Sequence, residues 1–159
     1  MSLWSKGILF MLLRINGAQW STGVAQFLDH LPEAPGTATN IVVRCSIPSF
    51  FEFHAIIDTA APFSILQFSL ACLLGWPTGD GEAKTLHSWR GDYDGALERI
   101  QIEIPADEGN SLITESTFFV AKDWTGANHP NFLGWNGILE RLRFAIDPGN
   151  NNFHFGALP

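Results

Sequence analysis

The chain has 159 residues, of which 46% are hydrophobic and 16% are charged. This composition excludes an intrinsically disordered chain, which combines few apolar residues with high charge. The length predicts one domain, since a domain takes roughly 100–200 residues. The 9 basic and 16 acidic residues give a net charge of −7, and the basic residues form no run. We therefore expect no nucleic-acid partner and no binding to acidic membrane surfaces.

The apolar segment at residues 7–13 is too short to span a membrane, which takes about 20 residues. It also has no good small-residue cleavage site, so we expect no signal peptide. The two cysteines, Cys45 and Cys72, form no Cys-x-x-Cys pair. We expect free thiols in a reducing compartment, which favours a cytoplasmic location. Cys72 falls on the apolar side of a predicted short helix, so we place it in the core.

The first 39 residues give the weakest pattern in the chain. The stretch from Val24 to Leu31 indicates a short helix that Pro32 ends, and residues 32–37 have the composition of a linker. We therefore expect residues 1–39 to form a loosely attached, poorly ordered extension, and residues 40–159 to form the folded domain.

Residues 40–159 predict an all-β domain, because short apolar and β-branched runs alternate with turns rich in Gly and Pro. Strands are expected at residues 41–47, 51–57, 64–66, 84–89, 96–104, 113–121, 144–146 and 153–155. Short helices are expected at residues 69–75 and 137–142, and a hairpin tip at residues 90–95. No long alternation of strands and helices is present, which argues against a doubly wound parallel sheet.

Asp58 is the candidate catalytic residue. It follows the apolar run Ala55-Ile56-Ile57, and no Lys or Arg lies between Cys45 and Ala83. A carboxylate at the end of a buried strand is costly unless it is paired or hydrogen-bonded. Two interpretations remain open from the residues alone: a side chain that caps a turn, and a carboxylate held for chemistry.

The segment from Ala55 to Leu66 resembles the active-site segment of retropepsin-like aspartic proteases, in which apolar residues precede Asp-Thr-Gly-Ala. The run Phe132-Leu133-Gly134, followed by a short helix and a strand, resembles the second hallmark of that family. The hairpin between Leu86 and Leu97 falls where the family places its substrate-covering flap. The order is matched over residues 40–156, and the resemblance implies a closed all-β barrel with one or two short helices.

The resemblance also implies a function, namely peptide hydrolysis by water held between two aspartates. Only one such Asp motif is present, so the second Asp58 would come from a second copy of the chain in a homodimer. Asp58 would be catalytic, and Thr59 would lock the two loops together. Ala60, Leu133 and Gly134 would also support the active site. Trp89 and Gly91 would lie in the flap and bind the substrate.

Ala60 departs from the family pattern, which has Gly at this position. If the site required a positive φ there, strain of about 1–3 kcal/mol would follow. An alternative therefore stays open: a catalytically inactive, dimeric peptide-binding or scaffold module of the same fold.

Other kinds of site find little support. The five histidines, at positions 30, 54, 87, 129 and 154, lack the spacing of a metal site. His54 is expected to be a packed edge residue. No Gly-x-Ser-x-Gly or phosphate-binding loop is present. We expect neither a metal nor a cofactor.

Overall fold

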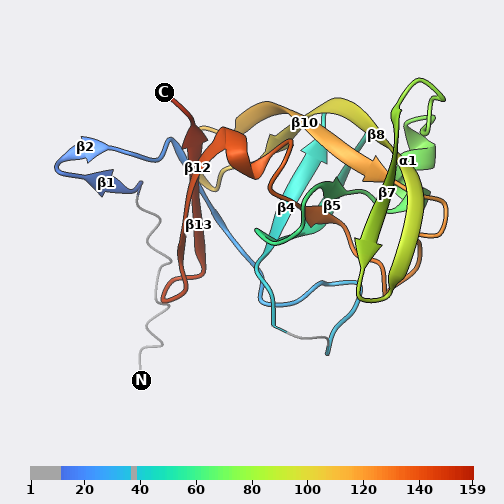
Figure 1. Cartoon of the computed structure of the whole chain (residues 1–159). Helices are drawn as coiled ribbons and strands as arrows, with labels where there is room; N and C mark the ends of the chain where they lie inside the picture. Colours follow the sequence, from blue (N-terminus) through green and yellow to red (C-terminus); the bar gives the residue numbers. More distant parts are fainter. Residues whose placement is uncertain (1–11, 37–38) are drawn as a thin grey trace.

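The computed structural model describes residues 12–36 and 39–159 (Figure 1). Most of the apolar segment 7–13 and part of the expected extension 1–39 lie outside these ranges. The expected short helices appear as α1 (Phe68–Leu73) and a 3₁₀ turn, η1 (Leu139–Arg141). Within the described ranges, no helix has the length and apolar character needed to cross a membrane.

A closed β-barrel forms most of the molecule (Figure 1), as the sequence predicts. Its strands are β4 (Val42–Ile47), β5 (Phe51–Ile57), β6 (Ser64–Ile65), β8 (Gly91–Ile104), β10 (Leu112–Val120) and β11 (Phe132–Leu133). They follow the order β10-β6-β11-β5-β4-β8, and the pairing of β8 with β10 closes the ring. The remaining strand, β7 (Glu82–Ser88), pairs with β8 outside the ring.

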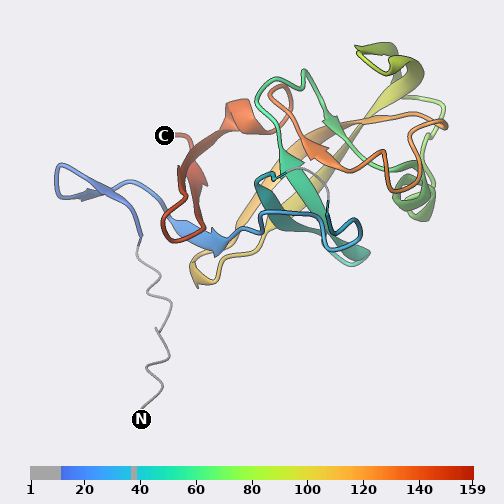
Figure 2. The same cartoon turned by 90° about the horizontal axis from the view of Figure 1, so that it is seen from below.

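A second sheet stands beside the barrel (Figures 1 and 2). It consists, in order, of β12 (Leu142–Asp147), β13 (Asn152–Ala157), β3 (Gly23–Gln26) and β9 (Glu108–Gly109). A small hairpin of β1 (Arg14–Ile15) and β2 (Ala18–Gln19) projects from the body of the molecule. Both strands of this hairpin are exposed.

The helix predicted from Val24 to Leu31 is wrong, because residues 23–26 form strand β3 between β13 and β9. Val24 and Ala25 are buried, and Leu28 pairs with Val42 of the barrel. A short apolar run fits a helix or a strand equally well, and here the neighbouring strands decide. The domain boundary at residue 40 stays a prediction, but residues 23–28 are hydrogen-bonded to the folded domain.

The core lies inside the barrel and continues onto one face of the second sheet. Alternation along β8 buries Ile102 and Ile104, as its sequence predicts. Phe153 and Phe155 of β13 join the same apolar cluster. The second sheet is therefore packed on the barrel through aromatic side chains.

The two thiols have opposite surroundings. Cys45 is fully buried, and burial raises its pKa to about 12, because the charged thiolate loses its hydration. Cys72 is exposed, so its predicted place in the core is wrong. Ala71 is the buried residue of α1, and Phe68 and Leu70 pack on the core in part, so Cys72 lies away from the face of the helix that contacts the barrel. Both thiols are free.

His154 is a buried histidine on the face of β13 opposite to that of Phe153 and Phe155. His154 pairs across the sheet with Ala145 and Val24. It is 6% exposed, and its Nδ1 has no partner among the described residues. Burial lowers the pKa of His154 because the imidazolium loses hydration, and the carboxylate of Asp147 opposes this shift only in part.

We predict that stability falls as the pH drops from about 7.5 to about 5, with His154 contributing to the loss. In the unfolded chain the imidazole takes up a proton near pH 6.5, whereas in the folded chain it stays neutral to lower pH. Protonation therefore favours unfolding in this window, and the effect levels off below the folded-state pKa. Urea unfolding measures the free energy of unfolding at the two pH values. The difference between these two free energies should be smaller for His154→Gln than for wild type. His87→Gln, on an exposed hairpin, is the control; an equal difference in wild type and His154→Gln would contradict the assignment.

Candidate active site

Asp58 lies directly after β5, in a tight turn. Its backbone N–H donates to the Leu133 carbonyl at 3.1 Å. Its carboxylate Oδ1 accepts hydrogen bonds from the N–H of Ala60 at 2.9 Å and of Ala61 at 3.2 Å. The turn-capping interpretation is therefore correct, and the turn amides satisfy this oxygen without a basic partner. Oδ2 accepts no hydrogen bond from the described residues, which leaves it available to a ligand.

The second hallmark segment lies against the Asp58 turn. Strand β11 lies between β5 and β6, parallel to the former and antiparallel to the latter. Gly134 follows it and donates its N–H to the buried Ser64 Oγ at 3.1 Å. Next, the N–H of Trp135 donates to the Ala61 carbonyl at 2.9 Å, and the N–H of Asn136 donates to the Pro62 carbonyl at 3.0 Å. Two segments far apart in sequence thus hold one turn from both sides.

Gly134 is required by a close approach of two backbones. A Cβ at this position would lie 2.2 Å from the carbonyl oxygen of Phe63. No side chain fits at that distance, so the Phe-Leu-Gly pattern has a steric cause.

Ala60 is accommodated without backbone strain. Within the described ranges, the non-glycine residues with positive φ are Asn16, Ser49 and Asn151, so Ala60 is outside the region that favours glycine. Ala60 and the neighbouring Thr59 are exposed. The condition under which Ala60 would store strain is not met.

The β7–β8 hairpin, here called the flap, carries Trp89 and Gly91. Its pairing runs as far as Ser88 opposite Gly91, so Trp89 and Arg90 form the two-residue tip. The tip expected at residues 90–95 is therefore too long, because residues 91–95 continue strand β8. Gly91 has a φ of +129°, which suits glycine.

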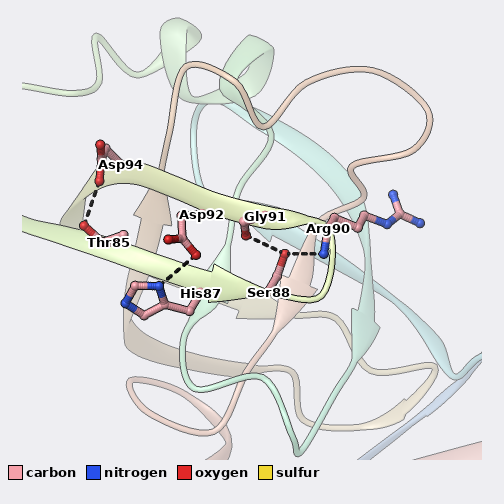
Figure 3. Close-up of polar contacts among 7 residues, drawn as sticks. All are labelled: Thr85, His87, Ser88, Arg90, Gly91, Asp92 and Asp94. Atoms are coloured by element: carbon pink, nitrogen blue, oxygen red, sulfur yellow. Dashed lines mark hydrogen bonds and ion pairs between the residues drawn. The ribbon is translucent and has the colours of Figure 1, made fainter.

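Side-chain contacts brace the flap across its two strands (Figure 3). Thr85 Oγ1 donates to Asp94 Oδ1 at 2.7 Å, and His87 Nδ1 lies 2.8 Å from Asp92 Oδ1. Near the tip, Ser88 Oγ donates to the Gly91 carbonyl at 3.0 Å. Asp92 and Asp94 thus have partners on the first flap strand.

An aromatic cluster ties the flap to the loop at residues 125–130. His129 Nδ1 lies 2.8 Å from the Thr125 carbonyl and donates to it, because a carbonyl only accepts. In the neutral imidazole, Nε2 is then the acceptor for the Tyr93 hydroxyl at 3.0 Å. The rings of Tyr93 and His129 lie edge-on to Trp124, with centroids 5.0 and 4.9 Å away. At the tip, the Arg90 guanidinium donates to the Asn128 carbonyl. The flap is therefore held over this loop within one chain.

A cleft of about 290 Å³ lies between the flap tip, the 125–130 loop and the end of β5. Its lining consists of Leu31, Asn40, Ile56, Ser88, Trp89, Arg90, Trp124, Ala127, Asn128, Pro130 and Phe132. Asp58 is not among them, but Ile56 precedes it by two residues on β5, and Phe132 adjoins Leu133. Trp89 is 89% exposed at the mouth.

The structure brings most of the predicted site residues into one unit. Asp58, Thr59 and Ala60 form the turn, and Leu133 and Gly134 lie against it. Trp89 lines the neighbouring cleft, and Gly91 shapes the flap tip. Apart from Trp89, sequence reasoning missed the cleft walls. Leu31 was assigned to a helix, and Trp124 carried no signal beyond its aromatic character.

The barrel, the Asp-bearing turn and the flap together define the retropepsin-like fold. A crystal structure of a retropepsin-like aspartic protease from Rickettsia conorii superposes on this chain with a TM-score of 0.53 at 16% sequence identity. The match covers 83% of this chain and 98% of that one. No protein-family model and no curated protein matches the sequence.

We predict that Gly134→Ala destabilises the protein by about 1–3 kcal/mol or more, because the added methyl group collides with the Phe63 backbone. Denaturant unfolding measures the change. Gly149→Ala is the matched control, since its Cβ would have one near neighbour, a side-chain oxygen of Asp147 at 3.2 Å. Gly149→Ala should change the free energy of unfolding by no more than about 0.5 kcal/mol. Equal effects for both variants would refute the close-approach explanation.

Proposed function

We propose that this protein is an aspartic endopeptidase that works as a homodimer, with Asp58 of each copy as the catalytic residue. The observation that carries the proposal is the held turn: both backbone and Oδ1 of Asp58 are fixed, while Oδ2 is left to bind water. The retropepsin-like fold supports the same assignment.

In the proposed reaction, the two Asp58 carboxyl groups share one proton, because two adjacent carboxylates do not readily both ionise. The ionised carboxylate takes a proton from the bound water as the water oxygen attacks the peptide carbonyl carbon. The protonated carboxyl group donates its proton to the carbonyl oxygen. The tetrahedral species then breaks its C–N bond as the leaving nitrogen takes the proton that the first carboxyl group gained from water. One hydroxyl of the tetrahedral species returns its proton to the second carboxylate as the new carboxyl product forms, so the pair again shares one proton. Neither a covalent intermediate nor a metal takes part.

The surface around the Asp58 turn supports a second copy as the partner. Thr59, Ala60 and Pro62 are exposed, and the indole of Trp135, directly after Gly134, is 46% exposed. Exposed apolar groups next to a half-complete catalytic pair are suited to a symmetric interface. In that dimer, Thr59 would hydrogen-bond across the two-fold axis.

The cleft beside the flap supports a peptide as substrate. Ile56, Trp124 and Phe132 give it apolar walls, and such walls accept a bulky apolar side chain. The flap above it has polar backbone groups that can pair with an extended peptide.

We predict that wild-type protein cleaves peptides from a mixed library at mildly acidic pH and that Asp58→Asn loses at least about 100-fold of the rate. Product peptides are measured by mass spectrometry. Asp123→Asn, an exposed acid outside the site, is the matched control and should cleave like wild type.

Sizing in solution tests the shared site independently. A strictly monomeric protein at high concentration, or an Asp58→Asn variant that cleaves as well as wild type, would rule out the mechanism. Peptide binding by a dimer with no cleavage would favour the alternative, a non-catalytic peptide-binding module.

We predict that Ala60→Gly changes the cleavage rate by no more than about two-fold, because Ala60 has no left-handed φ for glycine to relieve. The same change should lower stability by about 0.4–1 kcal/mol, because glycine adds entropy to the unfolded chain. Peptide cleavage and urea unfolding of the purified variant measure both effects. A gain in rate above about ten-fold would show that Ala60 impairs the natural protein.

A further inference from the structure

Among the described residues that line the cleft at the flap tip, Arg90 is the single charged one. The other lining residues are apolar or neutral. No acidic side chain of the described ranges forms an ion pair with Arg90. The cleft thus presents one unneutralised positive charge beside apolar walls, on a chain whose net charge is −7.

The position of Arg90 is fixed by contacts on several sides. Its backbone N–H donates to Ser88 Oγ at 3.1 Å (Figure 3). Its guanidinium carbon lies 4.7 Å from the ring centroid of Trp89, and its Nη1 donates to the Asn128 carbonyl. A carbonyl and an aromatic face orient the guanidinium but do not cancel its charge. Its remaining N–H groups keep the fork geometry that suits a carboxylate.

The nearest acids along the flap are already engaged. Asp92 lies against His87, and Asp94 accepts from Thr85 (Figure 3). Both contacts hold these carboxylates on the flap strands and keep them off the tip. Arg90 is therefore available to a carboxylate that arrives with a ligand in the cleft.

We propose that Arg90 is a specificity-determining residue that selects peptides carrying a carboxylate side chain next to a bulky apolar one. The apolar side chain would enter between Trp124 and Phe132, and the neighbouring Glu or Asp would meet the guanidinium at the mouth. This inference rests on the proposed function, because it assigns the cleft to a peptide.

The test compares matched peptides in which Glu, Gln or Lys flanks the same Phe. Binding is measured by fluorescence anisotropy to the Asp58→Asn protein, and cleavage is measured with wild type. The Glu peptide should bind about three- to ten-fold more tightly than the Gln peptide, as expected for a partly exposed charge pair, and the Lys peptide more weakly than either. Salt at about 0.5 M should reduce the preference.

Variants at the tip, made in the Asp58→Asn background, decide whether Arg90 is the cause. Arg90→Gln should abolish the preference for Glu, Arg90→Lys should keep part of it, and Arg90→Glu should transfer the preference to the Lys peptide. Arg99→Gln is the control, since Arg99 is exposed on β8, the strand that follows the tip, and does not line the cleft. The Arg99→Gln variant should bind all three peptides as tightly as the Asp58→Asn protein does.

The outcomes separate this inference from the proposed function. A charge preference in binding that depends on Arg90, without any cleavage by wild type, would support Arg90 and refute the protease. Cleavage that depends on Asp58 but treats Glu, Gln and Lys peptides alike would refute the role of Arg90 and leave the protease standing. Failure of all three peptides to bind, or a preference that survives Arg90→Gln, would also overturn the role of Arg90.

Discussion

The contact between Gly134 and the Phe63 backbone is the constraint on which the rest of the structure depends. It lets β11 enter between β5 and β6, and β11 joins these two strands in the ring that the β8–β10 pairing closes. It also places the Leu133 carbonyl where the N–H of Asp58 donates to it. The continuity of the barrel between β5 and β6 and the orientation of the candidate catalytic carboxylate therefore have the same steric origin. A change that separates these two backbones would affect both together.

Catalysis and recognition make different demands on this fold. In the proposed mechanism, the carboxylate pair is complete only when two copies meet. By contrast, described residues of one copy already form the cleft, and the Tyr93–His129 and Arg90–Asn128 contacts hold the flap beside it. In that proposal, one copy can present its cleft to a peptide before the catalytic pair exists. Affinity for a ligand and turnover of it are separable properties in such an arrangement.

Local patterns in the sequence predict those parts of the fold whose cause is local. Alternation along residues 99–104 predicts its strand, and the apolar run before Asp58 predicts a strand that ends at the turn. Gly134 was predicted from a resemblance, and its steric reason became visible only with Phe63 beside it. The interpretation of Asp58 as a turn cap was correct because its partners are two and three residues away.

Features set by distant partners escaped prediction. Residues 23–26 form a strand because β13 and β9 lie on either side, and nothing nearby in sequence indicates this. The pairing of Tyr93 with His129 joins residues 36 positions apart. The exposure of Cys72 depends on which side of α1 faces the barrel. Such contacts depend on the assembled fold, so a single sequence without relatives does not show them.

The early part of the chain has a practical importance. Strand β3 fills the gap between β13 and β9, and Leu31, which follows it, packs on Val42 and Ile56 and forms one wall of the cleft. A shortened protein that begins at residue 40 would leave two sheet edges unpaired and that wall missing. Unpaired edges invite aggregation. A recombinant form of the barrel should therefore retain the stretch from residue 23 onward, even though the sequence predicts a loosely attached extension there.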